Sequence, residues 1–306
     1  MTEQNEPMSD SPGGESSLND IDQIAEANFL PSLKTSEFEH PVGDEIPLPK
    51  VVVDPEKERM IGENDFLPVW FLERGVAAQR AVARVVLTKP YTTRGHTFPA
   101  GTGWATGFMV SPNLFMTNNH VIHEKSFADK VRVQFNYQKG PDDSEGITES
   151  YYPDAEDVFH TNRALDYTLV RLRPNQEEGE EPVEAGDVWG FIALNDSPIY
   201  GKNQHYNIVQ HPRGRRKEVS LQDNEIDKLF SNVVRYKADT EPGSSGSPVF
   251  NNAWELVALH HAGGDRDSVS GEWLNNEGIR IDAVINDLRD HFIAEERQDV
   301  LDELGI

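Results

Sequence analysis

Cysteine is absent from the 306 residues of the chain. No disulfide can therefore cross-link it, and a chain without cysteine suits a reducing compartment. The N-terminus also lacks the basic start and apolar stretch of a secretory signal. No run of 18 apolar residues is present to span a membrane. These absences lead us to expect a cytoplasmic protein without a membrane partner.

Basic residues are scarce. The sequence has 28 Lys and Arg against 53 Asp and Glu, a formal net charge of −25 at pH 7. A surface this acidic repels phosphate groups, which argues against a nucleic-acid partner. The one local exception is the basic run at residues 213–217. Short charge runs are usually solvated, so we expect a solvated hairpin beside a strand there.

The first part of the chain has little hydrophobic periodicity. Residues 1–65 hold 16 acidic and 4 basic side chains, together with clusters of Pro, Ser and Gly. Such a segment cannot bury enough apolar surface to offset its ordering entropy. We predict that residues 1–62 form a disordered acidic extension with a short helix over residues 21–30. The extension can act as a tether, as a docking arm for a regulatory protein partner, or as an inhibitory segment, and the sequence does not choose.

The rest of the chain reads mainly as short strands. A helix is expected over residues 66–76, with Pro68 in its first turn, where a missing N–H costs little. Short apolar runs separated by Gly, Pro and Asn then predict an all-β sandwich or barrel. The runs we assign as strands cover residues 81–87, 107–110, 131–135, 168–172, 206–209, 219–221, 233–236 and 256–259.

The C-terminus changes to a helical period. Ile285, Leu288 and Phe292 lie three and four residues apart, which predicts a helix over residues 282–294. Asp282 is a suitable N-cap for it. Residues 300–304 can continue this helix.

Three short strings carry the chemical signal. Residues 243–250 read Gly-Ser-Ser-Gly-Ser-Pro-Val-Phe, a serine between glycines that leads into an apolar strand. His120 ends a Thr-Asn-Asn-His string, and Asp166 precedes the strand that starts at Tyr167. A serine hydroxyl is a weak nucleophile unless a base lies within about 3 Å, and a histidine oriented by a carboxylate is such a base. The order His, Asp, Ser is that of the chymotrypsin class rather than the subtilisin or α/β-hydrolase orders.

On these strings, residues 80–295 resemble a trypsin-like serine endopeptidase of the chymotrypsin fold, closest to the bacterial glutamyl-endopeptidase (V8-like) branch. The resemblance implies two six-stranded antiparallel β-barrels and a C-terminal α-helix. The first barrel, with its short N-terminal helix, would span residues 63–183. The second barrel would span residues 184–281, and the C-terminal helix would span residues 282–306. The resemblance also implies hydrolysis of protein or peptide substrates through an acyl-enzyme intermediate, without a cofactor.

The resemblance assigns a role to each motif residue. His120 is the general base, Asp166 orients it, and Ser245 is the nucleophile. The backbone N–H groups of Gly243 and Ser245 form the oxyanion hole, where each donor contributes about 3–4 kcal/mol in other proteases. Taken singly, each string also has a structural interpretation: a hydrogen-bonding surface histidine, a strand-edge aspartate and a Gly-Ser turn.

One position departs from the animal trypsins. Ser244 stands before the proposed nucleophile, where those enzymes have an Asp that pairs with a newly cut N-terminal amine. This chain cannot use that activation switch. It therefore either folds in an active form or is controlled by other means.

The substrate pocket has two competing interpretations. Asp239 falls where trypsins place the carboxylate that binds Arg or Lys, whereas Thr240 and His260 fall where glutamyl endopeptidases bind an acidic side chain. We favour Glu or Gln over Arg or Lys as the residue before the cleaved bond. A contact between Asp239 and His260 would partly reconcile the two interpretations of the pocket. His261 and Gly263 lie along the strand edge that would pair with the substrate backbone. His261 either supports the site or is exposed.

Two other functions are weighed against a peptidase. His123 follows His120 at a spacing that suits a metal, but a third ligand is missing, so we expect no metal site. A non-catalytic or partner-regulated binding module on the same fold is the main alternative, because fold alone does not fix function.

Overall fold

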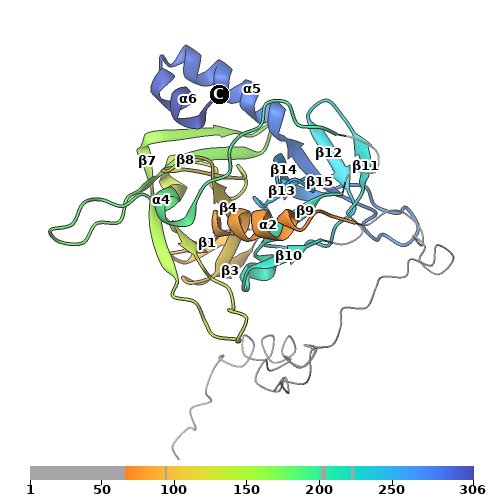
Figure 1. The fold of residues 1–306 in the computed structure, drawn as a ribbon, viewed down its shortest axis with the longest axis horizontal. Coiled ribbons are helices and arrows are strands. Elements are labelled where there is room, and N and C mark those ends of the chain that lie inside the picture. Colours follow the sequence, from red (N-terminus) through yellow and green to blue (C-terminus); the bar gives the residue numbers. More distant parts are fainter. Residues whose placement is uncertain (1–65, 94, 201–204, 222–223) are drawn as a thin grey trace, which may run out of the picture. The chain divides into compact units, whose positions relative to one another are not determined.

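The computed structural model describes residues 66–93, 95–200, 205–221 and 224–306, which are mostly β-strand with a few helices (Figure 1). The chain divides into two units, residues 1–62 and 63–306, and the described residues belong to the second. The predicted disordered extension and the helix over residues 21–30 lie outside the described residues. In the described part, none of the helices is long and apolar enough to cross a membrane.

The first helix, α2 (Trp70–Arg80), begins later than predicted and runs further. The carbonyl of Pro68 accepts the N–H of Phe71, so the proline precedes the helix instead of lying inside its first turn. Phe71 and Gly75, four residues apart, are the buried positions. A Cβ at Gly75 would lie 2.5 Å from the Trp254 ring, so the glycine allows the helix to pack closely on that side chain.

Six strands form a closed antiparallel barrel, as the sequence predicts. Its core is filled by apolar and aromatic side chains that are fully buried, among them Phe108, Phe115, Phe135 and Leu169. A hairpin of β2 (Tyr91–Thr93) and β3 (His96–Phe98) and the short helix α3 (Lys125–Ala128) lie outside the barrel order. In barrel order the strands are β1 (Val82–Leu87), β4 (Gly103–Met109), β5 (Leu114–Thr117), β8 (Tyr167–Arg173), β7 (Glu149–Asn162) and β6 (Val131–Phe135).

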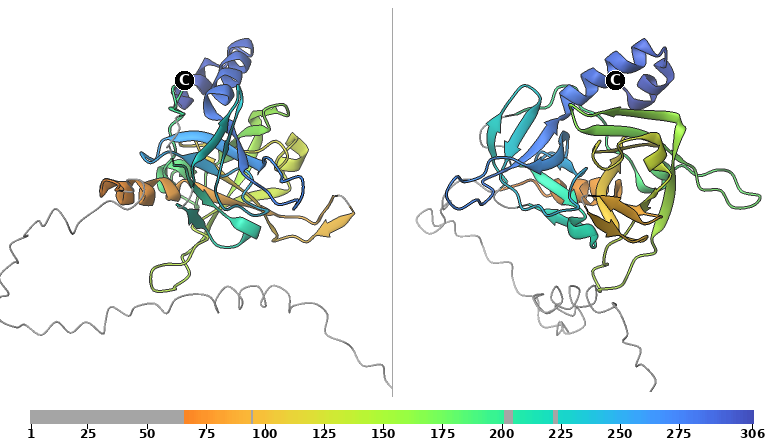
Figure 2. Two further views of the ribbon diagram at one scale, coloured as in Figure 1. Left: turned by 90° about the vertical axis from the view of Figure 1, so that its right-hand side faces the viewer. Right: turned by 180° about the vertical axis from the view of Figure 1, so that it is seen from behind.

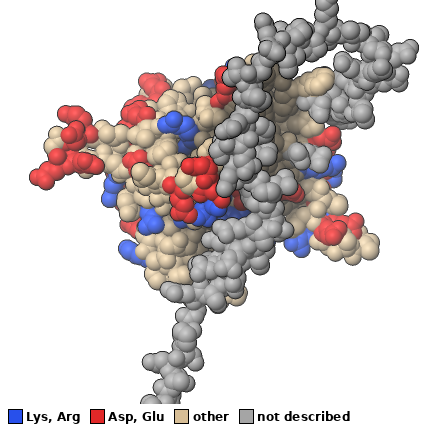
Figure 3. Space-filling model, turned by 60° about the horizontal axis from the view of Figure 1, so that its bottom comes forward, with Lys and Arg blue, Asp and Glu red and all other residues tan. Residues whose placement is uncertain are grey.

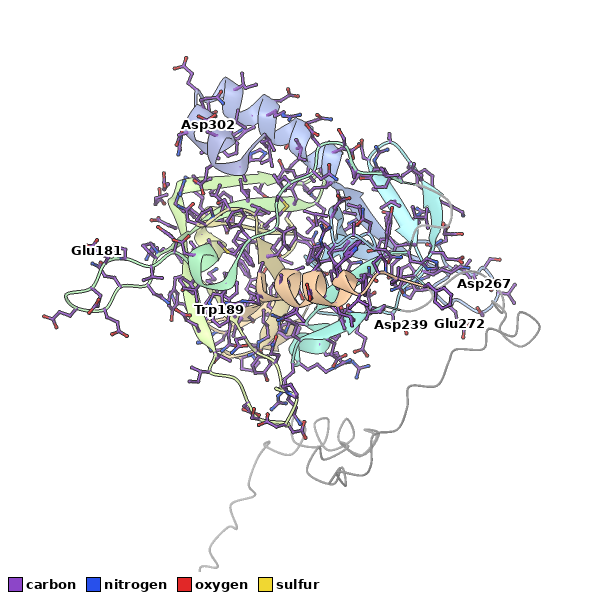
Figure 4. All side chains as sticks on the ribbon, viewed as in Figure 1. Glu181, Trp189, Asp239, Asp267, Glu272 and Asp302 are labelled. Carbon is purple, nitrogen blue, oxygen red and sulfur yellow. The ribbon has the colours of Figure 1, made fainter. Side chains whose placement is uncertain are left out.

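The connection from the first barrel carries a projecting acidic loop before α4 (Ala185–Trp189). Figure 3 shows acidic side chains on this projection, and Figure 4 labels Glu181 within it. The loop is exposed, and Gly179 at its tip has a positive φ of 88°.

The second half forms a seven-stranded antiparallel sheet, and a bridge between His205, before β9, and Glu225, before β11, joins its two sides, which is consistent with the expected second barrel. Among the described residues its outermost strands, β10 and β11, do not pair with each other. Both are short and mostly exposed, as sheet edges usually are. In sheet order the strands are β10 (Glu218–Ser220), β9 (Asn207–Gln210), β13 (Pro248–Phe250), β14 (Leu256–Gly263), β15 (Asn276–Arg280), β12 (Val233–Tyr236) and β11 (Ile226–Leu229).

Two helices close the chain, α5 (Ile281–Ala294) and α6 (Gln298–Leu304), which Figure 2 shows together at one end of the described part. The prediction of Asp282 as N-cap is wrong, because Arg280 holds that position and Asp282 lies in the first turn. A carboxylate there still interacts favourably with the helix dipole, and Asp282 also pairs with Arg280. The helix is interrupted at Glu296, whose φ is 55°, so α6 is separate from α5.

Candidate active site

His120 and Asp166 form a hydrogen-bonded pair. The Nδ1 of His120 lies 2.8 Å from Oδ2 of Asp166, and the backbone N–H of His120 donates to Oδ1 at 3.0 Å. Burial alone would raise the pKa of Asp166, but hydrogen bonds from His120 and His261 hold it well below its usual range. An ionised carboxylate only accepts hydrogen bonds, so Nδ1 of His120 must carry the proton. Its Nε2 is then left with a lone pair that can take up a proton.

The backbone at Asp166 is held in an uncommon conformation, with a φ of 43°. The amide of Asn118 donates to the Asp166 carbonyl at 2.9 Å. On the other side, Oδ1 of Asn162 accepts the backbone N–H groups of Ala164 and Leu165. These side chains determine the shape of the turn that presents the carboxylate to His120.

Helix α5 supports the same turn through Asp287. Its carboxylate accepts the hydroxyl of Tyr167 at 2.5 Å, Nδ2 of Asn162 at 2.8 Å and the ring of His160 at 2.9 Å. Burial would raise the pKa of Asp287, but these hydrogen bonds lower it below the ordinary value. The C-terminal helix is thereby joined to the residues on both sides of Asp166.

Ser245 lies where the second sheet meets the first barrel. Its carbonyl accepts the N–H of Thr106 at 2.9 Å. The neighbouring Gly246 has a φ of 86°, and a Cβ there would lie 2.1 Å from the Thr106 carbonyl oxygen and 2.4 Å from Oγ1 of Thr117. Thr117 is three residues before His120, so these contacts bring the serine loop and the histidine segment to the same place.

The burial of the three serine side chains in this loop is consistent with Ser245 as the nucleophile. Ser244 and Ser247 are fully buried, whereas Ser245 is partly exposed. Oγ of Ser247 donates to the Ser244 carbonyl, and Oγ of Ser244 accepts the N–H of Glu241. Within the described part of the chain, neither Oγ of Ser245 nor Nε2 of His120 makes a hydrogen bond, so the pair that would start the reaction is not hydrogen-bonded. Catalytic hydrogen bonds are often long until substrate is bound.

The predicted oxyanion loop exposes two backbone donors. Gly243 has a φ of 100°, and the carbonyl of the preceding Pro242 accepts the N–H of Arg213. In a trans peptide the C=O and N–H point in opposite directions, so the Gly243 N–H faces away from Arg213. Neither this N–H nor that of Ser245 donates to an acceptor in the described residues.

The basic run at residues 213–217 is largely half-buried or buried, so the expectation of a solvated hairpin is wrong. It begins in a 3-10 turn, η2 (Pro212–Gly214). Arg213 and Arg215 both pair with the carboxylate of Glu241, with Arg213 at 2.9 Å. Lys217 donates to the Gln79 carbonyl at 2.7 Å, and burial lowers the pKa of Lys217 to about 7.

A pocket of about 670 Å³ opens beside Ser245. It brings together all five residues predicted for substrate binding: Asp239, Thr240, His260, His261 and Gly263. The ring of Trp273 covers one wall, where a Cβ at Gly263 would lie 2.6 Å from it. The glycine is therefore required for this wall to close.

His260 is almost fully buried, with 4% of its surface exposed. Its Nδ1 lies 2.8 Å from the hydroxyl of Tyr236. Burial, with a smaller contribution from His261, lowers the pKa of His260 to about 3, so the ring is neutral near pH 7. Asp239 is exposed and makes no hydrogen bond to His260 among the described residues, so the contact that would reconcile the two interpretations of the pocket is not made.

Thr240 is oriented by a residue that the sequence did not single out. Its hydroxyl donates to Oδ1 of Asn276 at 2.9 Å, and Nδ2 of Asn276 donates to the Ala238 carbonyl. Tyr236 was overlooked in the same way. Tyr236 on β12 and Asn276 on β15 lie opposite each other in two paired strands. This pairing is not visible in a single sequence.

His261 is half-buried within the site, with 19% of its side chain exposed. Its Nδ1 lies 3.2 Å from Oδ2 of Asp166, and its Nε2 lies 3.0 Å from Oε1 of Glu277. Glu277 is a further residue that the sequence analysis missed. Its position next to the pocket residue Asn276 on strand β15 gave no signal, because successive residues of a strand point to opposite faces.

Several known proteins are similar in sequence to this chain. A trypsin-like peptidase domain model matches residues 105–259, which include His120, Asp166 and Ser245. An uncharacterized protein, y4fB, of Sinorhizobium fredii is 34% identical over 275 residues, covering 78% of this chain and 40% of that protein. Exfoliative toxin A of Staphylococcus aureus is 29% identical, over 56% of this chain and 60% of the toxin.

A glutamyl endopeptidase of Staphylococcus aureus is 27% identical, over 60% of this chain and 49% of the endopeptidase. The chain spans about half the length of the curated relatives it matches. The family model covers just over half of the chain. The chain therefore belongs to the trypsin-like peptidase domain family.

Proposed function

We propose that the chain is a serine endopeptidase in which Ser245, His120 and Asp166 form the catalytic triad. The observation that carries the proposal is the hydrogen bond between Nδ1 of His120 and Oδ2 of Asp166. It sets the tautomer that leaves Nε2 free to act as a base. The position of Ser245 beside two unpaired backbone donors supports the same conclusion.

In the proposed reaction, Oγ of Ser245 attacks the carbonyl carbon of the substrate while Nε2 of His120 takes its proton. The N–H groups of Gly243 and Ser245 stabilise the oxyanion as it forms. His120 then gives the proton to the leaving amine, and an acyl-enzyme remains on Ser245. Water, activated by the same histidine, hydrolyses the acyl-enzyme and regenerates the serine hydroxyl.

For the residue before the cleaved bond, we propose Gln ahead of Glu. A neutral His260 whose Nδ1 accepts the Tyr236 hydroxyl presents its Nε2–H to the pocket, where it can donate to an amide oxygen. It carries no positive charge to offset the desolvation of a buried carboxylate. Asp239 is exposed and makes no hydrogen bond to His260 among the described residues, so a preference for Arg or Lys ranks third.

Cleavage-site profiling by mass spectrometry on a diverse peptide mixture tests the proposal. The wild-type chain is compared with Ser245→Ala and with a matched serine variant, Ser231→Ala, at an exposed position. We expect the same cuts from wild type and Ser231→Ala, none from Ser245→Ala, and Gln before most cuts. Cuts that persist in Ser245→Ala would refute the assignment of the nucleophile.

A non-catalytic peptide-binding module is the second candidate. The absence of a hydrogen bond between Ser245 and His120 among the described residues favours it. This function predicts that peptides bind to the wild-type chain and to Ser245→Ala with equal affinity, and that neither cuts them. Isothermal titration with peptides that contain Gln, together with the cleavage profile, separates the two functions.

The acidic extension adds a regulatory proposal. We propose that residues 1–62, outside the described residues, dock a protein partner. Comparison of peptide turnover and partner binding for the full chain and a chain starting at residue 63 tests this. Unchanged turnover and unchanged binding would contradict it.

A further inference from the structure

One histidine of the site bridges two carboxylates from different parts of the fold. His261 on β14 contacts Asp166 of the first barrel through Nδ1 and Glu277 of β15 through Nε2. The side chains of the three residues are 16–19% exposed. The ring therefore links the second sheet directly to the carboxylate that orients His120.

The contacts define the protonation state of His261. Carboxylates only accept hydrogen bonds, so a ring that faces one at each nitrogen donates to both only as an imidazolium. Burial alone would lower the pKa of His261, but the hydrogen bonds with Asp166 and Glu277 outweigh it and raise the pKa above the ordinary value. A positive charge is therefore placed against Oδ2 of Asp166.

Further charged groups anchor the other end of this bridge. Nε of Arg235 on β12 lies 2.7 Å from Oε2 of Glu277, and its NH1 lies 2.6 Å from Oδ1 of Asp265. Lys228 on β11 pairs with the same Asp265 at 2.8 Å. Positive and negative groups thus alternate from Asp166 across the second sheet, and Glu277 cannot move without breaking its pairing with Arg235.

A local irregularity makes the arrangement possible. The pairing of β14 with β15 shifts register between His260 and Ala262. Such a bulge re-aims side chains that would otherwise alternate regularly between the two faces. His260 contacts Tyr236, whereas the next residue, His261, contacts Asp166 and Glu277.

We propose that His261 is a positioning residue, which holds Oδ2 of Asp166 in line with Nδ1 of His120 and is itself held by Glu277. The inference rests on the proposed peptidase function. Both imidazoles contact the same oxygen, at 2.8 Å for His120 and 3.2 Å for His261. The charged and titratable groups around His261 are His120 and Asp166 from the first barrel, His260 beside it on β14, Glu277 from β15 and Arg235 from β12.

The proposal separates alignment from substrate binding. His261→Ala removes both the donor and the positive charge, so we expect kcat to fall by about tenfold or more while KM changes little. Loss of the positive charge beside Asp166 should also move the acid limb of the kcat/KM profile to higher pH, by about one pH unit.

Two further variants distinguish alignment from charge. The side-chain amide of His261→Asn can still donate to Asp166 without a charge, so it should recover part of kcat but keep the displaced acid limb. Glu277→Gln should move the limb in the same direction, and combining it with His261→Ala should add little, because both act through one contact. His96→Ala, at an exposed histidine, is the matched control and should resemble wild type.

The test is the pH dependence of kcat and KM for these variants, with the NMR resonance of the His120 Nδ1 proton in wild type, His261→Asn and His261→Ala. A raised KM with wild-type kcat and an unmoved acid limb would show that His261 only binds substrate, and would overturn the proposal. If the wild-type chain cuts no peptide, the proposed function fails, and the NMR resonance decides this inference separately. A Nδ1 proton resonance that shifts or broadens in His261→Ala and returns toward its wild-type position in His261→Asn supports positioning, and a resonance unchanged in His261→Ala refutes it.

Discussion

The backbone N–H of Arg213 donates to the carbonyl of Pro242 at an N···O distance of 2.5 Å. Because the peptide is trans, this bond directs the N–H of Gly243 to the opposite side. The pairing of Arg213 with Glu241 holds the same turn from the side chains. The donor proposed for the oxyanion is thus oriented by a neighbouring turn before any substrate binds.

Gly243→Ala should disrupt this orientation. A Cβ there would lie 2.8 Å from the Gly214 nitrogen and 2.9 Å from the His211 carbonyl oxygen, at a φ of 100°. The peptide must shift, so we expect kcat to fall by about 10²–10³, the usual loss for one oxyanion donor, with a smaller change in KM. Steady-state kinetics on one peptide substrate measures both.

The matched control is Gly179→Ala. That glycine also has a positive φ, 88°, but a Cβ there meets no atom within 4 Å. It should lower stability by about 1 kcal/mol through backbone strain and leave kcat unchanged. Equal loss of activity in both variants would show that the Gly243 effect is not local to the oxyanion loop.

Tyr236→Phe should weaken selection for Gln. Without the hydroxyl, Nδ1 of His260 loses its 2.8 Å partner and the tautomer that presents Nε2–H is no longer favoured. Loss of about one hydrogen bond predicts a fall of roughly fivefold to tenfold in kcat/KM for a Gln peptide. Tyr206→Phe is the control, because the buried Tyr206 hydroxyl has no partner among the described residues.

The ratio of kcat/KM for matched Gln and Glu peptides should also vary little between about pH 6 and pH 8. His260, with a pKa of about 3, stays neutral over that range. A ratio that turns strongly toward Glu as the pH falls from 8 to 6 would mean that the ring gains a proton, contrary to its buried environment.

His261 should make stability depend on pH. Its pKa is raised in the folded state, so its stabilisation is fully present below the unfolded-state value of about 6.5 and is lost as the pH rises through the folded-state value. Wild type should exceed His261→Asn in free energy of unfolding by about 1–2 kcal/mol at pH 6, with a smaller gap at pH 9. Urea titrations at both pH values measure it, and a gap that widens with pH would contradict the assigned imidazolium.

Tyr167→Phe should loosen the turn before Asp166. The hydroxyl donates to Asp287 at 2.5 Å, and hydrogen bonds to charged groups contribute about 1.5–3 kcal/mol. We expect a loss of that size in the free energy of unfolding, and a severalfold fall in kcat as Asp166 becomes less well held. Tyr152→Phe is the control, since Tyr152 is 49% exposed on β7, and it should change neither quantity.

Much of this site could be predicted from local sequence. The strings around His120, Asp166 and Ser245 each combine a reactive side chain with the strand or glycines that present it, and together they carried the resemblance that implied the two-barrel fold. Short apolar runs likewise indicated most strands. Helix ends were less certain, because Pro68 and Asp282 are compatible with positions just before or inside a helix.

The contacts that orient the site residues depend on sheet register, which one sequence does not contain. Tyr236 meets His260 and Glu277 meets His261 only because β12, β15 and β14 are neighbours and β14 carries a bulge. The pairing of Arg213 with Glu241 likewise could not be predicted from one sequence. A basic run is usually solvated, and here Glu241, on a loop distant in sequence, binds it.

The most direct test of the account is covalent labelling with a fluorophosphonate, which reacts with a serine hydroxyl activated by a base. The full chain is treated with the probe beside Ser245→Ala and His120→Ala, and intact mass and peptide mapping locate the adduct. The account predicts one adduct on Ser245, absent in Ser245→Ala and formed far more slowly in His120→Ala. No adduct on the wild-type chain, or labelling of Ser245 at the same rate without His120, would contradict it.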